Sequence, residues 1–180
     1  MKRVISFIVL VVCLFSLTSV AFAEDFSFRG TTFGMSMKQV AAAEGTPPVR
    51  VDDALLQYMI HHNDDYYADI IYMFENNLLY SIFVTLVKSN PHTDSNLYID
   101  DFNGLDLDMK ARFGEPFMDS VYSWSNDLFE GIPSCYGIAL ESGHLDIMSS
   151  WDFDECLIGH TLTSSDGELL HQLFFISTKH

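Results

Sequence analysis

Alternation of apolar and polar side chains dominates the chain between Leu55 and Val87. In each of three runs, large apolar residues share one face, as expected for strands that contribute one face to a protein core. Polar turn clusters, Asn63-Asp64-Asp65 and Glu75-Asn76-Asn77, separate the runs. The pattern therefore predicts an antiparallel meander with strands over 55–62, 68–74 and 78–87.

The segment before this meander carries the end signals of a short helix. Ser36 suits the N-cap position, and Gln39 three residues later completes a capping box. Gly45 suits the left-handed conformation that ends many helices, and Pro47 prevents the helix from continuing. We therefore expect a helix over 37–44.

A second helix is predicted farther along the chain, where apolar residues recur at steps of three and four. These residues are Tyr98, Phe102, Leu105, Met109 and Phe113. The helix should end at Gly114, because Pro116 follows two residues later. Segments with strand character come next, over 121–124, 136–141, 145–153, 157–163 and 169–176.

The two predicted helices end in similar triplets, Gly45-Thr46-Pro47 and Gly114-Glu115-Pro116, and strands follow each of them. We therefore predict an α+β fold of two helix-plus-antiparallel-β-meander units that share or abut their cores. The first unit would cover residues 24–90 and the second residues 91–180.

The amino terminus has the features of a signal peptide. Lys2 and Arg3 precede an apolar run over 4–20, and Ala21-Phe22-Ala23 gives the small-x-small pattern of a cleavage site. A retained membrane anchor is the alternative, because the run is nearly long enough to span a bilayer. We expect residues 1–23 to be a signal peptide, and the protein to be exported to the periplasm or the extracellular medium.

The chain is strongly acidic, with 25 Asp and Glu against 9 Lys and Arg and a formal net charge of −16. Loss of Lys2 and Arg3 with the leader would bring the charge to −18. Such a charge repels nucleic acid and anionic lipid head groups. It is compatible with basic partners, with cations, or simply with solubility.

Only Cys135 and Cys156 follow the predicted leader. Two cysteines in an oxidising compartment are most simply explained by one disulfide bond, which we expect here. The alternatives are two buried thiols or a pair of metal ligands.

Residues with potential chemistry are present but do not form a known catalytic motif. The sequence lacks G-x-S-x-G, H-E-x-x-H, P-loop and G-x-G-x-x-G motifs. His61-His62 with Asp64 and Asp65, or Asp152 with Asp154 and Glu155, could ligate a cation, although polar turns are the commoner explanation. His144, His160 and His171 have no nucleophile placed beside them by any motif. We expect no cofactor and no resident metal.

One face of the predicted meander suggests a binding surface. If the face that includes Tyr58 and Tyr72 packs on a helix, the opposite face exposes Met59, His61, Ile71, Met73, Phe83 and Thr85. An apolar patch with a polar rim is typical of a protein-contact surface. Alternatively, this face packs on the second unit or on a loop.

One motif resembles a known family. Phe33-Gly34-Met35-Ser36, followed by Gln39-Val40 and then by Gly45-Thr46-Pro47, is similar to the helix motif of SmpA/OmlA outer-membrane assembly lipoproteins and of secreted β-lactamase inhibitory proteins. These proteins pack a helical segment on an antiparallel sheet, and the inhibitors carry this unit twice. The motif covers about 20 residues, and the chain lacks both a lipidation cysteine and a second G-M-[ST].

The whole chain also resembles exported bacterial proteins of unknown function. The matching segments are Phe28 to Ser36, Tyr72 to Tyr80, Tyr98 to Pro116, and Trp151. Taken together, the sequence predicts a non-enzymatic binding module that recognises a protein partner through an open sheet face. The alternative is an envelope hydrolase or a cation-binding protein that uses its His and carboxylate clusters.

Overall fold

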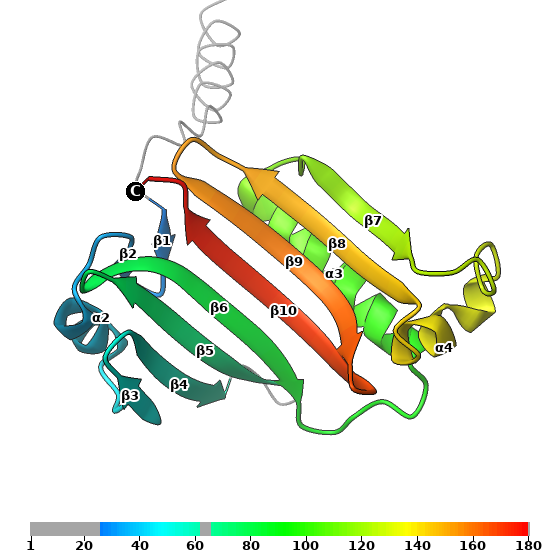
Figure 1. Cartoon of the computed structure of the whole chain (residues 1–180), viewed down its shortest axis with the longest axis horizontal. Coiled ribbons are helices and arrows are strands. Elements are labelled where there is room, and N and C mark those ends of the chain that lie inside the picture. Colours follow the sequence, from blue (N-terminus) through cyan, green and yellow to red (C-terminus); the bar gives the residue numbers. More distant parts are fainter. Residues whose placement is uncertain (1–25, 62–65, 180) are drawn as a thin grey trace, which may run out of the picture.

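The computed structural model describes residues 26–61 and 66–179 (Figure 1). The predicted signal peptide, residues 1–23, lies outside the described residues. Within them, no helix has both the length and the apolar character needed to cross a membrane.

Eight strands form one antiparallel sheet in the order β3-β4-β5-β6-β10-β9-β8-β7. The bounds of these strands are β3 Arg50–Asp52, β4 Leu55–His61, β5 Tyr66–Glu75, β6 Leu78–Lys88, β7 Met118–Trp124, β8 Leu145–Asp152, β9 Cys156–Ser165 and β10 Glu168–Ser177. A small separate hairpin, β1 Ser27–Phe28 and β2 Thr31–Thr32, precedes them. The chain is therefore an α+β protein with a large antiparallel sheet, as its alternating pattern predicted.

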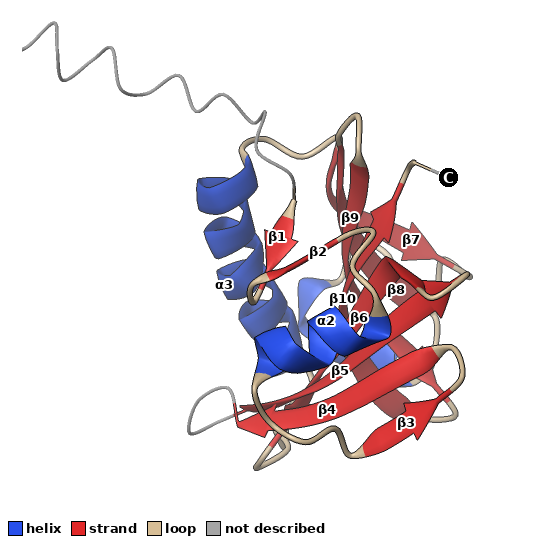
Figure 2. Ribbon diagram, turned by 90° about the vertical axis from the view of Figure 1, so that its left-hand side faces the viewer, coloured by secondary structure: helices blue, strands red, loops and turns tan. Residues whose placement is uncertain are grey.

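The helices are α2 Met37–Glu44, α3 Asn96–Phe113 and α4 Tyr136–Glu141, with a 3-10 turn at Pro133–Cys135 before α4. Figure 2 shows α2 and α3 on the same side of the sheet. Val40 of α2 and Met109 of α3 belong to one buried cluster with residues of six strands, including Ile82 of β6 and Trp151 of β8. The two longer helices thus cover one face of the sheet.

Helix α2 begins and ends where its sequence signals predict. The side-chain oxygen of Gln39 accepts hydrogen bonds from Ser36 N–H at 2.9 Å and from Ser36 Oγ at 2.7 Å. Gly45 adopts a left-handed conformation at φ 66°, which a residue with a side chain enters at a cost. The local chemistry of this segment is therefore sufficient to determine the helix.

The two groups of four strands join at β6 and β10. Val84 pairs with Leu173 on the helix-covered face, and Phe83 pairs with Phe174 on the other face. Helix α2 precedes β3 to β6 in the chain, and α3 precedes β7 to β10. Residues nearly 90 positions apart therefore become neighbours in one continuous sheet.

The prediction of a strand over 136–141 is wrong, because this segment is helix α4. Within this segment, the consecutive residues Ala139 and Leu140 are both buried, whereas Ile138 is exposed. Two buried residues in a row fit a helix better than the two-residue alternation of a strand. Gly137 donates its N–H to Asn96 Oδ1 at 2.9 Å, and a Cβ at Gly137 would lie 2.5 Å from Asn96 N. Close packing against the start of α3 therefore decides the conformation of this short segment.

The predicted disulfide is also wrong, because Cys135 and Cys156 are free thiols. Cys135 precedes α4, which leads into the Leu145 end of β8, and Cys156 follows the Asp152 end of the same strand. A strand of this length extends about 25 Å, at roughly 3.3 Å per residue. Disulfide bonding needs Cα atoms within about 7 Å. The length of β8 therefore keeps the two thiols apart.

An ion pair between half-exposed Arg29 and the buried carboxylate of Glu44 attaches the amino-terminal hairpin and α2 to the sheet. Arg29 donates to both carboxylate oxygens of Glu44, with Nε 3.0 Å from Oε1, and the Tyr72 hydroxyl donates to Oε1. The Glu44 side chain has no exposed surface. The hydrogen bond of Arg29 to Glu44 raises the pKa of Arg29. Burial, and then the separate hydrogen bond of Tyr72 to Glu44, raise the pKa of Tyr72. Three segments of the chain therefore depend on one carboxylate.

Replacing Glu44 with alanine should lower the free energy of unfolding by about 2 kcal/mol or more, because Tyr72 and Arg29 would lose their common acceptor. Urea denaturation at pH 7 measures this difference. The control is Glu115→Ala at an exposed position, which should change stability by less than about 0.5 kcal/mol. Equal effects of the two variants would contradict the structural role of Glu44.

The free thiols predict the alkylation pattern of the protein. Cys156 is 2% exposed and burial raises its pKa to about 12, whereas Cys135 is only half-buried. In the protein without the predicted leader, which contains Cys13, iodoacetamide at pH 8 should therefore add one group to the folded form at Cys135, and two groups after unfolding without reductant. Intact mass spectrometry counts the adducts. An unfolded, unreduced protein that takes up none would contradict the two free thiols.

Candidate binding surface on the sheet

The sheet has a second face, opposite the helices, which we call the open face. It carries the alternate side chains of each strand, and Figure 2 shows α2 and α3 on the other side of the sheet. Many open-face side chains are half-buried by their neighbours within the sheet, and Met59 is 48% exposed. Neither α2 nor α3 covers the open face.

All the residues predicted to form a contact surface lie on the open face. Met59 and His61 are on β4, Ile71 and Met73 on β5, and Phe83 and Thr85 on β6. Their chain neighbours, including Tyr58, Tyr72 and Ile82, are buried on the helix-covered face. Alternation along each strand thus separates the two sets of side chains.

An apolar row crosses the middle of the open face. Ile71 pairs with Phe83, which pairs with Phe174, which pairs with Gly159. The rings of Phe83 and Phe174 lie 6.5 Å apart. A Cβ at Gly159 would lie 1.9 Å from Cζ of Phe174, so this ring lies directly on bare backbone. We call these four residues the apolar row.

A polar row runs beside the apolar row, and its side chains bond to one another. Gln57 donates to Asp69 Oδ1 at 2.8 Å, and Gln172 donates to Thr85 Oγ1 at 3.0 Å. Such bonds between strands hold these side chains in defined positions before any partner arrives. The open face therefore combines an apolar centre with ordered polar groups.

The second half of this surface escaped prediction from the sequence. Phe174, Gln172 and Gly159 lie on β10 and β9, and only the pairing of β6 with β10 brings them beside Phe83. The sequence indicated a strand over 169–176, and the two-residue period of a strand places Gln172 and Phe174 on the same face. It contained no information about which strand would be its neighbour.

Two of the three histidines that lacked a partner in the sequence meet under α3. His160 Nε2 lies 2.7 Å from His171 Nε2, and His160 Nδ1 lies 3.3 Å from Asp106 Oδ1. The ring of Phe102 stacks on His160 with centroids 4.0 Å apart. Asp106 also forms an ion pair with Lys110 at 3.0 Å. These residues make a buried polar chain on the helix-covered face.

The geometry of the buried polar chain determines where its protons lie. Burial opposes ionisation of Asp106, but hydrogen bonds from His160, Ser149 and Lys110 outweigh it and hold the pKa of this carboxyl well below its usual range. An ionised Asp106 accepts the proton on His160 Nδ1, so His160 Nε2 accepts from His171 Nε2–H. His171 Nδ1 is then an unprotonated nitrogen, and it has no hydrogen-bond partner in the described part of the chain.

Burial limits the chemistry of the buried polar chain. Asp106, His160 and His171 are at most 3% exposed, and the nearby Ser149 is fully buried. A substrate could reach these groups only if α3 moved away from the sheet. The arrangement therefore supports a structural role, in which polar groups satisfy one another inside the core.

A second polar cluster lies where β5, β6 and α3 meet. Oδ2 of Asp101 accepts hydrogen bonds from Tyr66 at 2.5 Å, from His92 at 2.7 Å and from Lys88 at 3.2 Å. Burial raises the pKa of Asp101, but these hydrogen bonds together outweigh it and lower the pKa. The cluster ties the connection between β6 and α3 to the sheet.

The residues considered as cation ligands do not converge. Within residues 26–61 and 66–179, no three His, Cys, Asp or Glu side chains are grouped closely enough to hold a metal ion. Glu155 forms an ion pair with Lys179. The His61 ring contacts the Tyr67 ring edge to face, and His62, Asp64 and Asp65 lie outside the described residues.

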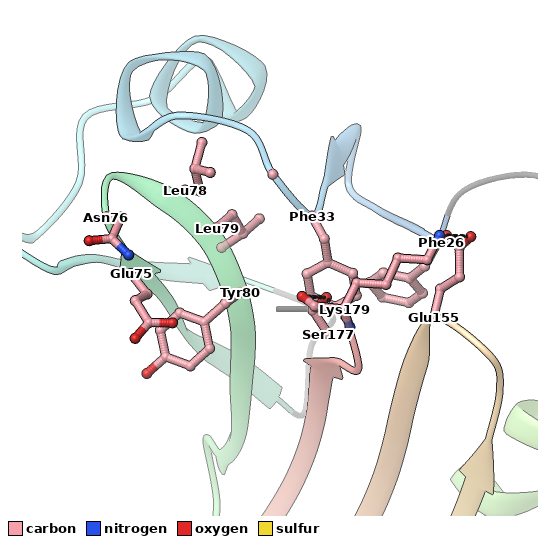
Figure 3. Close-up of a pocket in the computed structure, with 11 residues that line it drawn as sticks. Phe26, Phe33, Glu75, Asn76, Leu78, Leu79, Tyr80, Glu155, Ser177 and Lys179 are labelled. Carbon is pink, nitrogen blue, oxygen red and sulfur yellow. Dashed lines mark hydrogen bonds and ion pairs between the residues drawn. The ribbon is translucent and has the colours of Figure 1, made fainter.

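A groove of about 570 Å³ lies at one end of the sheet, between the amino-terminal hairpin and the β5–β6 turn (Figure 3). Phe26, Phe33 and Leu79 supply apolar walls, and Glu155 and Lys179 form an ion pair at its rim. Phe26 also stacks on Phe33 and on Phe175, with centroids 5.1 and 5.0 Å apart. The groove holds none of the histidines, so it does not combine with them into a reaction site.

The buried histidine pair predicts sensitivity to acid. Burial lowers the pKa of His171 to about 3, below the ordinary value of 6.5, so the neutral form stabilises the fold fully above pH 6.5. This stability is lost as the pH falls from 6.5 towards 3, by about 2–3 kcal/mol at pH 4.5. The wild type should thus lose more stability between pH 7 and pH 4.5 than His171→Gln, which cannot take up a proton.

Urea unfolding at both pH values measures this difference, and pH 4.5 lies above the range in which Asp106 titrates. The control is His144→Gln, which changes a histidine outside the pair. Parallel pH profiles for the wild type and His171→Gln would contradict the prediction.

Comparisons with known proteins give no match, whether made against protein-family models, curated proteins or solved structures. The resemblance of the first helix motif therefore stays an expectation.

Proposed function

We propose that this chain is a non-enzymatic binding module that recognises a protein partner through the open face. The observation that carries the proposal is the apolar row, with Ile71, Phe83 and Phe174 at the centre of a face opposite both longer helices. Aromatic and aliphatic side chains surrounded by polar groups are typical of the centre of a protein interface.

The order of the polar side chains supports the same proposal. Gln57 and Asp69, and likewise Gln172 and Thr85, are already hydrogen-bonded across neighbouring strands. A partner would therefore immobilise few rotamers on this surface, which lowers the entropic cost of association.

The topology supports a two-unit description of the fold, which we also propose. Each unit would consist of one helix followed by four antiparallel strands, with α2 and β3 to β6 in the first and α3 and β7 to β10 in the second. The binding surface would then extend over both units through the contact of β6 with β10. Export, through the predicted signal peptide, would bring this surface to partners in the periplasm or outside the cell.

Burial of the histidines weighs against the alternative of a hydrolase. His160, His171 and Asp106 are closed off under α3, and the serines nearest to Asp106 are also buried or half-buried. An enzyme would need one of these groups in contact with a substrate.

Two adjacent substitutions on β6 test the proposal. Phe83→Asp places a charge on the open face and should change the free energy of unfolding by about 1 kcal/mol or less. Ile82→Asp places the same charge in the fully buried core and should prevent folding. Circular dichroism and urea unfolding measure both effects.

The binding part of the test uses the wild type and folded Phe83→Asp as matched baits in extracts of the native source. A partner retained by the wild type should be lost from Phe83→Asp. A partner retained equally by both baits would contradict the open face as the binding site. Unfolding of Phe83→Asp to the same extent as Ile82→Asp would show that the open face is a buried surface.

A further inference from the structure

The positive charges of this protein are largely neutralised by its own carboxylates. Of the 9 Lys and Arg residues, two lie in the predicted leader, outside the described residues. Five of the others form ion pairs, namely Arg29 with Glu44, Arg50 with Asp52, Lys88 with Asp101, Lys110 with Asp106 and Asp119, and Lys179 with Glu155. Three of these pairs, those of Arg29, Lys88 and Lys110, lie on the side of the sheet that the helices cover.

The open face carries carboxylates that lack such partners. Strand register places Asp69 of β5, Asp146 and Asp152 of β8, and Glu168 of β10 on this face. In the described part of the chain, none of these four forms an ion pair with a lysine or arginine. Arg50 is placed on the same face by its pairing with Gln57, but it is neutralised by Asp52.

Two of these carboxylates lie beside the apolar row. Asp69 lies two residues from Ile71 on β5, and Asp152 lies two residues from Ser150, which pairs with Gly159. Asp146 lies at the other end of β8. Partial burial removes some of the water around its carboxylate and raises its pKa, and no neighbouring cation offsets this effect. The open face thus has an apolar centre and a negatively charged margin.

We infer that the partner is a basic protein, whose docking surface has an apolar patch bordered by lysine or arginine side chains. This inference rests on the proposed function and names the chemistry of the partner. A cationic margin would neutralise Asp69, Asp146 and Asp152 and steer the encounter by long-range attraction. A second copy of this chain does not fit, because like charges would face one another across the interface.

The probe is a set of three amphipathic peptides of 14 residues, each with the same leucines on one helical face. The remaining positions are lysine in the first peptide, glutamine in the second and glutamate in the third. Titration of the ¹⁵N-labelled protein with each peptide, followed by amide chemical shifts, locates the bound peptide. Isothermal titration calorimetry gives the dissociation constant.

The lysine peptide should shift the amides of β4, β5, β6, β10, β9 and β8 and should bind about tenfold more tightly than the glutamine peptide. Three exposed charge pairs, each worth a factor of two or three, account for this ratio. An increase in NaCl from 50 to 500 mM should remove most of the difference, because salt screens exposed charges.

Two matched sets of substitutions separate the open face from the net charge of the protein. The first is Asp69→Asn with Asp146→Asn and Asp152→Asn, and it should weaken binding of the lysine peptide about tenfold. The second is Asp100→Asn with Asp108→Asn and Asp127→Asn, three exposed carboxylates away from the open face. It changes the net charge equally and should alter binding by less than about twofold. An equal loss in both sets would overturn the inference, because it would show attraction to overall charge alone.

The outcomes distinguish the inference from the proposed function. If the glutamine peptide binds the open face as tightly as the lysine peptide, the charge inference fails and the proposed function stands. If no peptide shifts open-face amides and Phe83→Asp leaves partner capture unchanged, both fail. If the protein alone forms a dimer in sedimentation velocity that Phe83→Asp dissociates, the occupant is a second copy and the inference is overturned.

Discussion

The pairing of β6 with β10 is the contact on which most of this structure depends. It joins two antiparallel groups of strands into one sheet and places Leu86 beside His171 on one face and Phe83 beside Phe174 on the other. The main buried cluster includes Val84 and Ile82 of β6 together with Leu173 and Phe175 of β10. Without this contact, each group of strands would have a second unpaired edge, and the main buried cluster would be divided. The open face would also end at Phe83.

Polar groups are distributed unequally between the two faces of the sheet. On the helix-covered face the buried carboxylates are matched, as in the bonds of Glu44 with Arg29 and of Asp106 with His160 and Lys110. An unmatched charge there would cost several kcal/mol, so every buried carboxylate needs a partner. Carboxylates of the open face keep their contact with water and tolerate the lack of a cation. This difference in solvation explains why carboxylates without a cationic partner are tolerated on the open face but not beneath the helices.

The buried histidines show how a polar chain can serve the core without serving catalysis. His160 and His171 share one proton between their Nε2 atoms, and Phe102 stacks on the first ring. Because the second ring is neutral and closed to water, its contribution to stability depends on pH, while substrates have no access. Their position under α3 thus makes them part of the fold, whereas the sequence had left them as unassigned candidates.

Local patterns in the sequence determined the elements that depend on local chemistry. The Ser36 and Gln39 capping box and the left-handed Gly45 predicted α2, because caps act within one helical turn. Alternation placed Met59, Ile71, Met73 and Phe83 on a single face, because the side-chain period of a strand is two.

Only the tertiary structure decided the pairing of β6 with β10, the meeting of His160 with His171, the helical form of 136–141 and the separation of Cys135 from Cys156. Each of these depends on contacts between segments distant in the chain, and the periodicity of one segment carries no information about its neighbour in space.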